Sequence, residues 1–126
     1  MPLVRIALRK GTTPEFRQAL SDSVHRAMVE TIKIPGQDKF QIIAECDETG
    51  LVYDQSYLGI PRTDAIVMIQ ITISAGRSIE VKKALFARIA KLLKEAPGIS
   101  PEDVFVNLVE VAKENWSFGN GIAQYA

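Results

Sequence analysis

The sequence reads as one segment written twice, with equivalent positions 65 residues apart and no gap between the copies. Aligning Gly11 with Gly76 brings identical residues together throughout both segments. These identical pairs include Glu15/Glu80, Ala19/Ala84, Leu20/Leu85, Glu30/Glu95, Ile34/Ile99, Asp38/Asp103, Phe40/Phe105 and Glu45/Glu110. Each copy is therefore expected to form the same supersecondary unit, and the fold must be built from two of them.

Both copies contain an apolar stripe with helical spacing. Its members are Phe16, Leu20, Val24, Ala27 and Met28 in copy one, and Val81, Leu85, Ile89, Leu92 and Leu93 in copy two. Steps of four, four, three and one mark one face of an α-helix. Thr13 and Ser78 stand where N-caps are expected. We predict one helix from Pro14 to about Glu30 and a second that ends before Pro97.

Apolar runs flank both helices and predict strands at residues 3–8, 40–44, 65–73 and 104–111. Each copy then reads as a β-α-β unit, whose two strands pair in parallel with the helix crossing over them. Two such units give an α+β fold, a four-stranded sheet with two helices on one face. The other face is expected to be apolar and uncovered, which predicts self-association.

The length of 126 residues and the 47% hydrophobic content indicate a single domain with a real core. We divide it into repeat one (about 2–46), a linker (47–64), repeat two (about 65–112) and a C-terminal tail (113–126). Fifteen basic residues balance fifteen acidic ones, which argues against nucleic-acid or membrane binding. One cysteine, Cys46, and one histidine, His25, offer no metal-site spacing. Without a signal peptide or a membrane-spanning run, we expect a cytoplasmic protein that needs no metal or cofactor.

One difference between the copies points to chemistry. Copy one begins at Met1-Pro2, where removal of the methionine exposes a secondary amine, whereas copy two has Val67 at the position of Pro2. Amino groups at chain ends titrate close to neutrality, at roughly 7.7 to 8.0. Burial or a nearby cation disfavours the ammonium form. Pro2 is therefore a candidate general base.

Arg77 is the second candidate, and its equivalent in copy one is Thr12. An arginine just before the N-cap Ser78 is unfavourable for the helix dipole. Its guanidinium, beside unpaired backbone amides, makes a site for an anion such as a carboxylate. Copy one supplies the amine and copy two the arginine, so neither half holds a complete site. The two groups could meet within one chain or across a subunit boundary.

Three motifs carry a resemblance to a known family. Met1-Pro2 opens a strand, Ala75-Gly76-Arg77-Ser78 opens a helix, and Trp116-Ser117-Phe118-Gly119-Asn120-Gly121 closes the chain. Together they resemble the tautomerase superfamily, and most of all its malonate semialdehyde decarboxylase-like branch and the fused 4-oxalocrotonate tautomerase-like proteins. The resemblance implies a tautomerase/MIF-like fold, a homotrimer, a mature N-terminal Pro2, an Arg77 that binds a substrate carboxylate or carbonyl oxygen, and a pocket wall at Phe118.

The resemblance also implies roles for residues that the repeat leaves ambiguous. Asp38 matches an acidic residue that assists catalysis in the decarboxylase branch. Because Asp103 occupies the same position in copy two, a turn or capping role for both aspartates is the alternative. Trp116 is expected to share the pocket wall with Phe118 or to fill a subunit contact. Lys39 is a candidate second contact for substrate, next to the position at which short tautomerases have an arginine. His25 and Cys46 receive no function.

The decarboxylase pattern has two arginines around a proline before the second helix, whereas this chain has Ala75-Gly76-Arg77. We therefore predict a cofactor-independent tautomerase acting on a small carboxylate-bearing enol or 2-oxo acid. A rival enzyme hypothesis keeps Pro2 protonated, as the acid in decarboxylating a 3-oxo acid or hydrating an unsaturated acid. A third hypothesis, from a different class, is a noncatalytic binding or assembly protein on the same scaffold.

Overall fold

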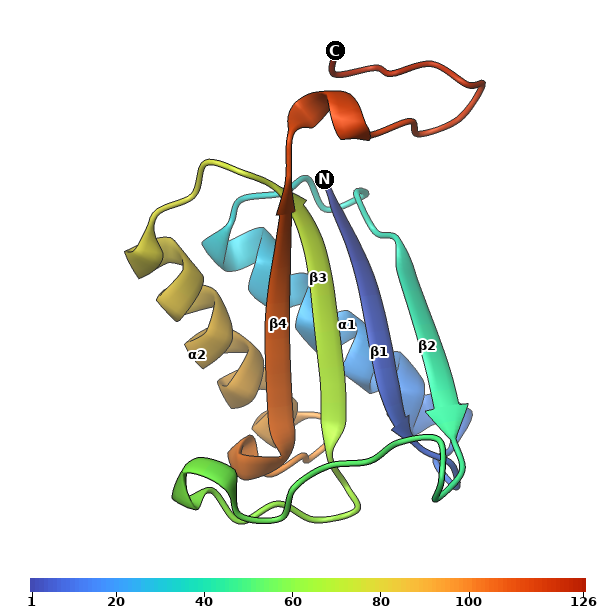
Figure 1. Cartoon of the computed structure of the whole chain (residues 1–126), viewed down its shortest axis with the longest axis vertical. Coiled ribbons are helices and arrows are strands. Elements are labelled where there is room, and N and C mark those ends of the chain that lie inside the picture. Colours follow the sequence, from blue (N-terminus) through green and yellow to red (C-terminus); the bar gives the residue numbers. More distant parts are fainter.

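The two copies form two β-α-β units that share one sheet (Figure 1). The structure is a computed structural model that describes all 126 residues. Copy one consists of β1 (Pro2–Arg9), α1 (Pro14–Thr31) and β2 (Gln41–Cys46), and copy two of β3 (Val67–Ser74), α2 (Ile79–Glu95) and β4 (Val104–Val111). Short 3₁₀ turns lie at η1 (Tyr57–Gly59), η2 (Pro101–Asp103) and η3 (Lys113–Asn115). The predicted α+β class is confirmed, and each predicted element is present within about two residues of its expected ends.

Each helix begins directly after its predicted N-cap, Thr13 or Ser78. The Thr13 hydroxyl accepts a hydrogen bond from the amide of Phe16 at 3.0 Å, and the Ser78 hydroxyl accepts one from the amide of Val81 at 3.2 Å. Each satisfies one of the amides that a helix leaves free in its first turn. Before each cap the chain turns at Gly11 or Gly76, whose φ angles of 111° and 126° favour glycine. Both copies therefore make the same strand-to-helix turn.

The sheet has the strand order β2-β1-β3-β4. Within each copy the strands pair in parallel, as predicted, and the copies join through the antiparallel pair β1 and β3. In that pair Pro2 lies opposite Ile73, and Leu8 lies opposite Val67. The start of copy one therefore lies beside the end of β3, at the end of the sheet opposite to the start of copy two.

The core lies between the sheet and the two helices, which cover a single face (Figure 1). It contains 18 buried apolar residues, with every second residue of β1 and β3 pointing into it. The other face is open, and its exposed residues include Ile42 and Phe105. It is not uniformly apolar, however. Arg5, Gln70 and Asn107 also lie on it, and the amide of Gln70 donates to the Asn107 oxygen at 3.1 Å.

The linker and the tail cover opposite ends of the sheet (Figure 1). They also correspond in the repeat, because Leu51 and Trp116 are 65 residues apart, as are Arg9 and Ser74. Arg9 donates to the Leu51 carbonyl at 3.2 Å, and the Trp116 indole donates to the Ser74 hydroxyl at 3.0 Å. Equivalent strand ends thus anchor both segments. None of the helices is both long and apolar enough to span a bilayer.

Candidate active site

A depression of about 540 Å³ lies at the end of the sheet where β1 begins and β3 ends. Its lining comes from three parts of the chain: the N-terminus, the turn between β3 and α2, and the tail. The lining residues are Met1, Ser74, Ala75, Gly76, Arg77, Lys113 and Tyr125. Because β1 and β3 are antiparallel, the N-terminus of copy one and the turn of copy two meet within one chain. Sequence reasoning left open whether they met this way or across a subunit boundary.

Pro2 is buried at the first position of β1, and the preceding Met1 is half-buried. The Met1 nitrogen lies 3.7 Å from Oδ2 of Asp38. While Met1 is attached, the Pro2 nitrogen belongs to a peptide bond and has no proton to exchange. Removing Met1 converts it into the secondary amine that ends the chain, one residue from the nitrogen that faces the Asp38 carboxylate.

Asp38 is only 5% exposed, and neither of its carboxylate oxygens has a hydrogen-bond partner in the protein. Leaving a buried polar group without a partner costs about 1–3 kcal/mol, and more for a charged group. Such a group in a folded protein calls for an explanation, and a role in catalysis is one. The N-terminal nitrogen is the charged group that faces it.

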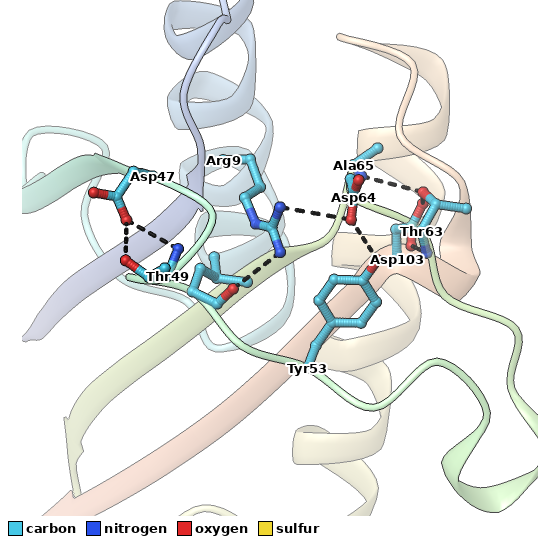
Figure 2. Close-up of polar contacts among 9 residues, drawn as sticks. Arg9, Asp47, Thr49, Tyr53, Thr63, Asp64, Ala65 and Asp103 are labelled. Carbon is cyan, nitrogen blue, oxygen red and sulfur yellow. Dashed lines mark hydrogen bonds and ion pairs between the residues drawn. The ribbon is translucent and has the colours of Figure 1, made fainter.

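The equivalent residue of copy two has a different environment. Asp103 is 3% exposed, but it accepts hydrogen bonds from the backbone amide of Thr63 at 2.7 Å and from the Thr63 hydroxyl at 2.6 Å (Figure 2). These bonds anchor the linker residue Thr63 to Asp103, so the Asp103 carboxylate has a structural role. The geometry gives Asp38 no such bonds.

Arg77 is half-buried, and two backbone carbonyls orient it. Nη1 donates to the Ser74 carbonyl at 3.1 Å, and Nη2 approaches the carbonyl of Ile32, at the end of α1, at 3.5 Å. A guanidinium has five N–H donors, so these two contacts leave others for a ligand. No carboxylate pairs with Arg77 within 4 Å. It can therefore bind an anion in the depression without first breaking an ion pair.

The predicted pocket-wall residues Trp116 and Phe118 are not among the residues that line the depression. Trp116 stacks on Phe118 with ring centroids 5.6 Å apart, and Phe118 meets Tyr125 edge-on at 5.0 Å. Tyr125 lines the depression, whereas Trp116 and Phe118 support it. Sequence reasoning missed Tyr125 and Lys113. The only available signal was that both belong to the tail that follows the last strand, on the side of Arg77.

Lys39 is not brought to the depression. Its ammonium lies 2.7 Å from Asp22 on α1, and this hydrogen bond is the main cause that lowers the pKa of Asp22 below its usual value. Arg5, another cation of copy one, lies on the open face of the sheet. The second cation at the depression is Lys113. The structure contains no cluster of three or more histidine, cysteine or acidic side chains arranged to share a metal ion.

Two fused β-α-β units, with a strand-opening proline and an arginine at one end of the sheet, define a tautomerase-type enzyme. Family profiles described as "Tautomerase enzyme" match residues 2–60 and 38–119. The chain is 41% identical to the probable tautomerase YusQ of Bacillus subtilis (strain 168) over 124 residues, which cover 98% of each protein. It is 34% identical to YrdN, a probable tautomerase of the same organism, over 99% of this chain and 96% of that one. The chain belongs to the tautomerase family.

Solved structures agree with this assignment. A malonate semialdehyde decarboxylase inhibited by 3-bromopropiolate superposes with a TM-score of 0.92 at 40% identity, covering 98% of this chain and 93% of that one. A second malonate semialdehyde decarboxylase, described with decarboxylase and hydratase activities, superposes with a TM-score of 0.91 at 33% identity, covering 98% and 95%. The predicted family, its fold and an enzyme of the tautomerase or related decarboxylase type are confirmed.

Proposed function

We propose that the protein is a cofactor-independent tautomerase of small carboxylate-bearing enols or 2-oxo acids, with Pro2 as its catalytic amine. The observation that carries this proposal is the meeting of the chain's N-terminus and Arg77 at one end of the sheet, within one chain. Lys113 adds a second positive charge to the lining of the depression. Two cations facing one hollow favour an anionic substrate.

The reaction follows from the roles of these groups. The Pro2 amine takes a proton from the carbon beside the substrate carbonyl, and the electrons of the broken C–H bond form an enolate. Arg77 binds the substrate carboxylate in bidentate fashion and stabilises the negative charge on the enolate oxygen. Returning the proton to that oxygen gives the enol. The same steps in reverse convert an enol to the keto form, so no atom or electron is gained or lost.

Asp38 favours a second candidate reaction. Its carboxylate faces the N-terminal nitrogen and stabilises an ammonium there, so that Pro2 acts as an acid. In decarboxylating a 3-oxo acid, the bond to the carboxyl carbon breaks, carbon dioxide leaves, and the electrons pass to the 3-oxo group to form an enolate. Pro2 then donates the proton that the enolate takes up. The 40% identity to a malonate semialdehyde decarboxylase supports this alternative.

We further propose a cytoplasmic homotrimer with one such site per chain. The support for assembly is the open face of the sheet, where large apolar side chains such as Phe105 and Ile42 remain exposed. Burying this face against other copies of the chain removes apolar surface from water. Light scattering together with intact mass measures the assembly and the processing of Met1 in one sample.

Pro2→Ala and Arg77→Ala test the site, with Thr12→Ala as the control because Thr12 is the copy-one equivalent of Arg77. We expect Pro2→Ala to lower kcat by about 10²–10⁴-fold. Arg77→Ala should raise KM for carboxylate substrates as well as lower kcat/KM. The assays use phenylpyruvate, 2-hydroxymuconate and a 3-oxo acid. Wild-type activity in both Pro2→Ala and Arg77→Ala would refute the proposal.

Titration of a ¹⁵N-labelled Pro2 nitrogen in the processed protein separates the two candidate reactions. A midpoint below about 7 supports the base, and one well above about 8, the upper end for ordinary α-amino groups, supports the acid. Asp38→Asn should move the midpoint downward in either case, because it removes the anion that favours the ammonium. An unchanged midpoint in Asp38→Asn would mean that the carboxylate does not act on the amine.

A further inference from the structure

The segment that carries Asp38, residues 36–41, is held against α1 by polar contacts on both sides of the aspartate. The His25 ring nitrogen Nε2 lies 2.7 Å from the Gly36 carbonyl, two residues before Asp38. On the other side, the Lys39 ammonium lies 2.7 Å from Asp22. Further along the chain, the side-chain amide of Gln41 donates a hydrogen bond from Nε2 to the Ser21 carbonyl at 3.2 Å. Ser21, Asp22 and His25 lie within about one turn of α1, so a single patch of the helix holds the whole segment.

Copy two has none of these contacts. The residues equivalent to His25 and Asp22 are Ala90 and Ala87, and those equivalent to Lys39 and Gln41 are Val104 and Val106. These apolar side chains have no donors or acceptors. The hydrogen bonds from Thr63 hold Asp103 directly instead. The side-chain contacts to the helix therefore occur only in the copy whose aspartate has no donor of its own.

The backbone holds this segment less firmly than a strand. The amide of Asp38 donates to Pro35 and that of Lys39 to Gln37, both within the segment itself. The first bond to the sheet runs from the amide of Val4 to the carbonyl of Phe40 at 3.1 Å. Between Pro35 and Phe40 the path of the chain therefore depends on the side chains that reach α1.

Polar atoms without partners also concentrate here. Five buried side-chain nitrogen or oxygen atoms in the molecule have no hydrogen-bond partner. Four of them belong to this region: Nδ1 of His25, both carboxylate oxygens of Asp38 and Oε1 of Gln41. A fold selected for stability alone favours the apolar solution that copy two has adopted at the equivalent helix positions.

We propose that His25, the Lys39–Asp22 pair and Gln41 are positioning residues that hold the Asp38 carboxylate beside the N-terminus, where removal of Met1 leaves the Pro2 amine. This inference rests on the proposed function, because it assigns them to Asp38 at that site. His25 is the key member, since its contact is closest to Asp38 on the side that has no bond to the sheet. Lys39 thus acts through the loop rather than by touching substrate.

The test replaces these residues with their copy-two equivalents: His25→Ala, Asp22→Ala and Gln41→Val, singly and together. His25→Gln keeps a donor near the position of Nε2 and is the conservative variant. Arg26→Ala is the matched control, because Arg26 is exposed on the same helix and pairs only with Glu30. For each variant, kcat and KM are measured, and amide hydrogen exchange is followed in residues 36–41 and in β3.

A misplacement of about 1 Å can reduce a rate by about 10²-fold. We expect His25→Ala to lower kcat about tenfold with KM nearly unchanged, and the triple variant to lower it about 10²-fold. Exchange in residues 36–41 should accelerate while that of β3 stays the same. His25→Gln should recover most of the rate, and Arg26→Ala should resemble wild type.

The outcomes separate this inference from the proposed function. If wild type and Asp38→Asn differ in activity but the triple variant keeps the wild-type kcat, the positioning role is wrong and the function stands. If kcat falls only in proportion to a general loss of folded protein, with β3 exchange faster as well, the residues are merely structural and the inference fails. A wild-type protein inactive on every substrate overturns the proposed function. An Asp38→Asn variant as active as wild type leaves the positioning residues with nothing to position, and the inference fails while the roles of Pro2 and Arg77 stand.

Discussion

The two ends of the sheet are built from equivalent positions of the repeat, yet their buried aspartates differ. We call the linker end the closed end, because its aspartate has hydrogen-bond partners, and the tail end the open end, because its aspartate has none. At the closed end, where the linker crosses, Asp103 accepts two hydrogen bonds from Thr63, and Asp64 accepts one from Tyr53 at 2.6 Å and lies 3.7 Å from Arg9 (Figure 2). At the open end, Asp38 has no donor and Arg77 has no carboxylate partner. The repeated unit thus pairs its buried aspartate at the closed end and leaves Asp38 and Arg77 available at the open end.

This contrast separates what the fold requires from what the site requires. The features common to both copies are the strand-end glycine, the N-cap and the apolar stripe, and these specify the β-α-β unit. The features found in only one copy are Pro2, Arg77 and the polar contacts of His25, Asp22 and Gln41. Proteins commonly accept lower stability at functional sites, and the open end has the pattern expected of such a site.

The strongest test of the comparison mixes Pro2→Ala chains with Arg77→Ala chains. Both groups lie at the open end of one chain, so no mixed assembly contains an intact pair, and we expect no recovery of activity. Native mass spectrometry verifies that the chains have exchanged. Wild type mixed with Arg77→Ala is the control and should retain activity in proportion to its wild-type chains. Partial recovery in the double-variant mixture would mean that the pair forms between subunits.

A second test makes the same substitution at both ends. Asp103→Ala removes two hydrogen bonds to a buried carboxylate and should lower the free energy of unfolding by about 2–4 kcal/mol. Asp38→Ala removes a carboxylate without hydrogen bonds, so stability should stay the same or rise, while kcat falls. Denaturant unfolding and steady-state kinetics give both values. Equal losses of stability at the two positions would show that the ends are not as different as their contacts indicate.

The smallest expected difference concerns pH. The Thr12 hydroxyl lowers the pKa of Glu45, and the Lys82 ammonium lowers that of Glu110, both from a usual value of 4.5. A lowered folded-state pKa contributes stability above the unfolded value that is lost as the pH falls through the folded one. Below about pH 4.5, the free energy of unfolding should therefore fall less steeply with decreasing pH in Glu45→Gln and Glu110→Gln than in wild type. Added salt should reduce the Glu110 contribution more, because its largest cause is the charged Lys82, whereas at Glu45 the hydrogen bonds from Thr12 outweigh the ion pair with Arg17.

The fold could be predicted almost completely from the sequence, because the repeat gives two separate sequence patterns for each helix and strand of the unit. Agreement between Thr13 and Ser78, or between Leu20 and Leu85, removes the ambiguity that a single helix or strand leaves. The predicted site residues Pro2 and Arg77 were recognisable from chemistry that only one copy has. Side-chain pairing could not be predicted in this way. Lys39 reaches back 17 residues to Asp22, a choice made by the path of the loop rather than by residue type.

The antiparallel pairing of β1 with β3 has a further consequence for variation in this chain. Two identical unfused units paired in this way would present the same residues at both ends, so every substitution would appear at both ends at once. In the fused chain each end has its own residues, and a change at one end occurs once. Sequence change can therefore alter substrate preference at the depression while the linker end keeps its internal bonds. The linker end is accordingly the place to attach a label or a surface when the N-terminus must remain free.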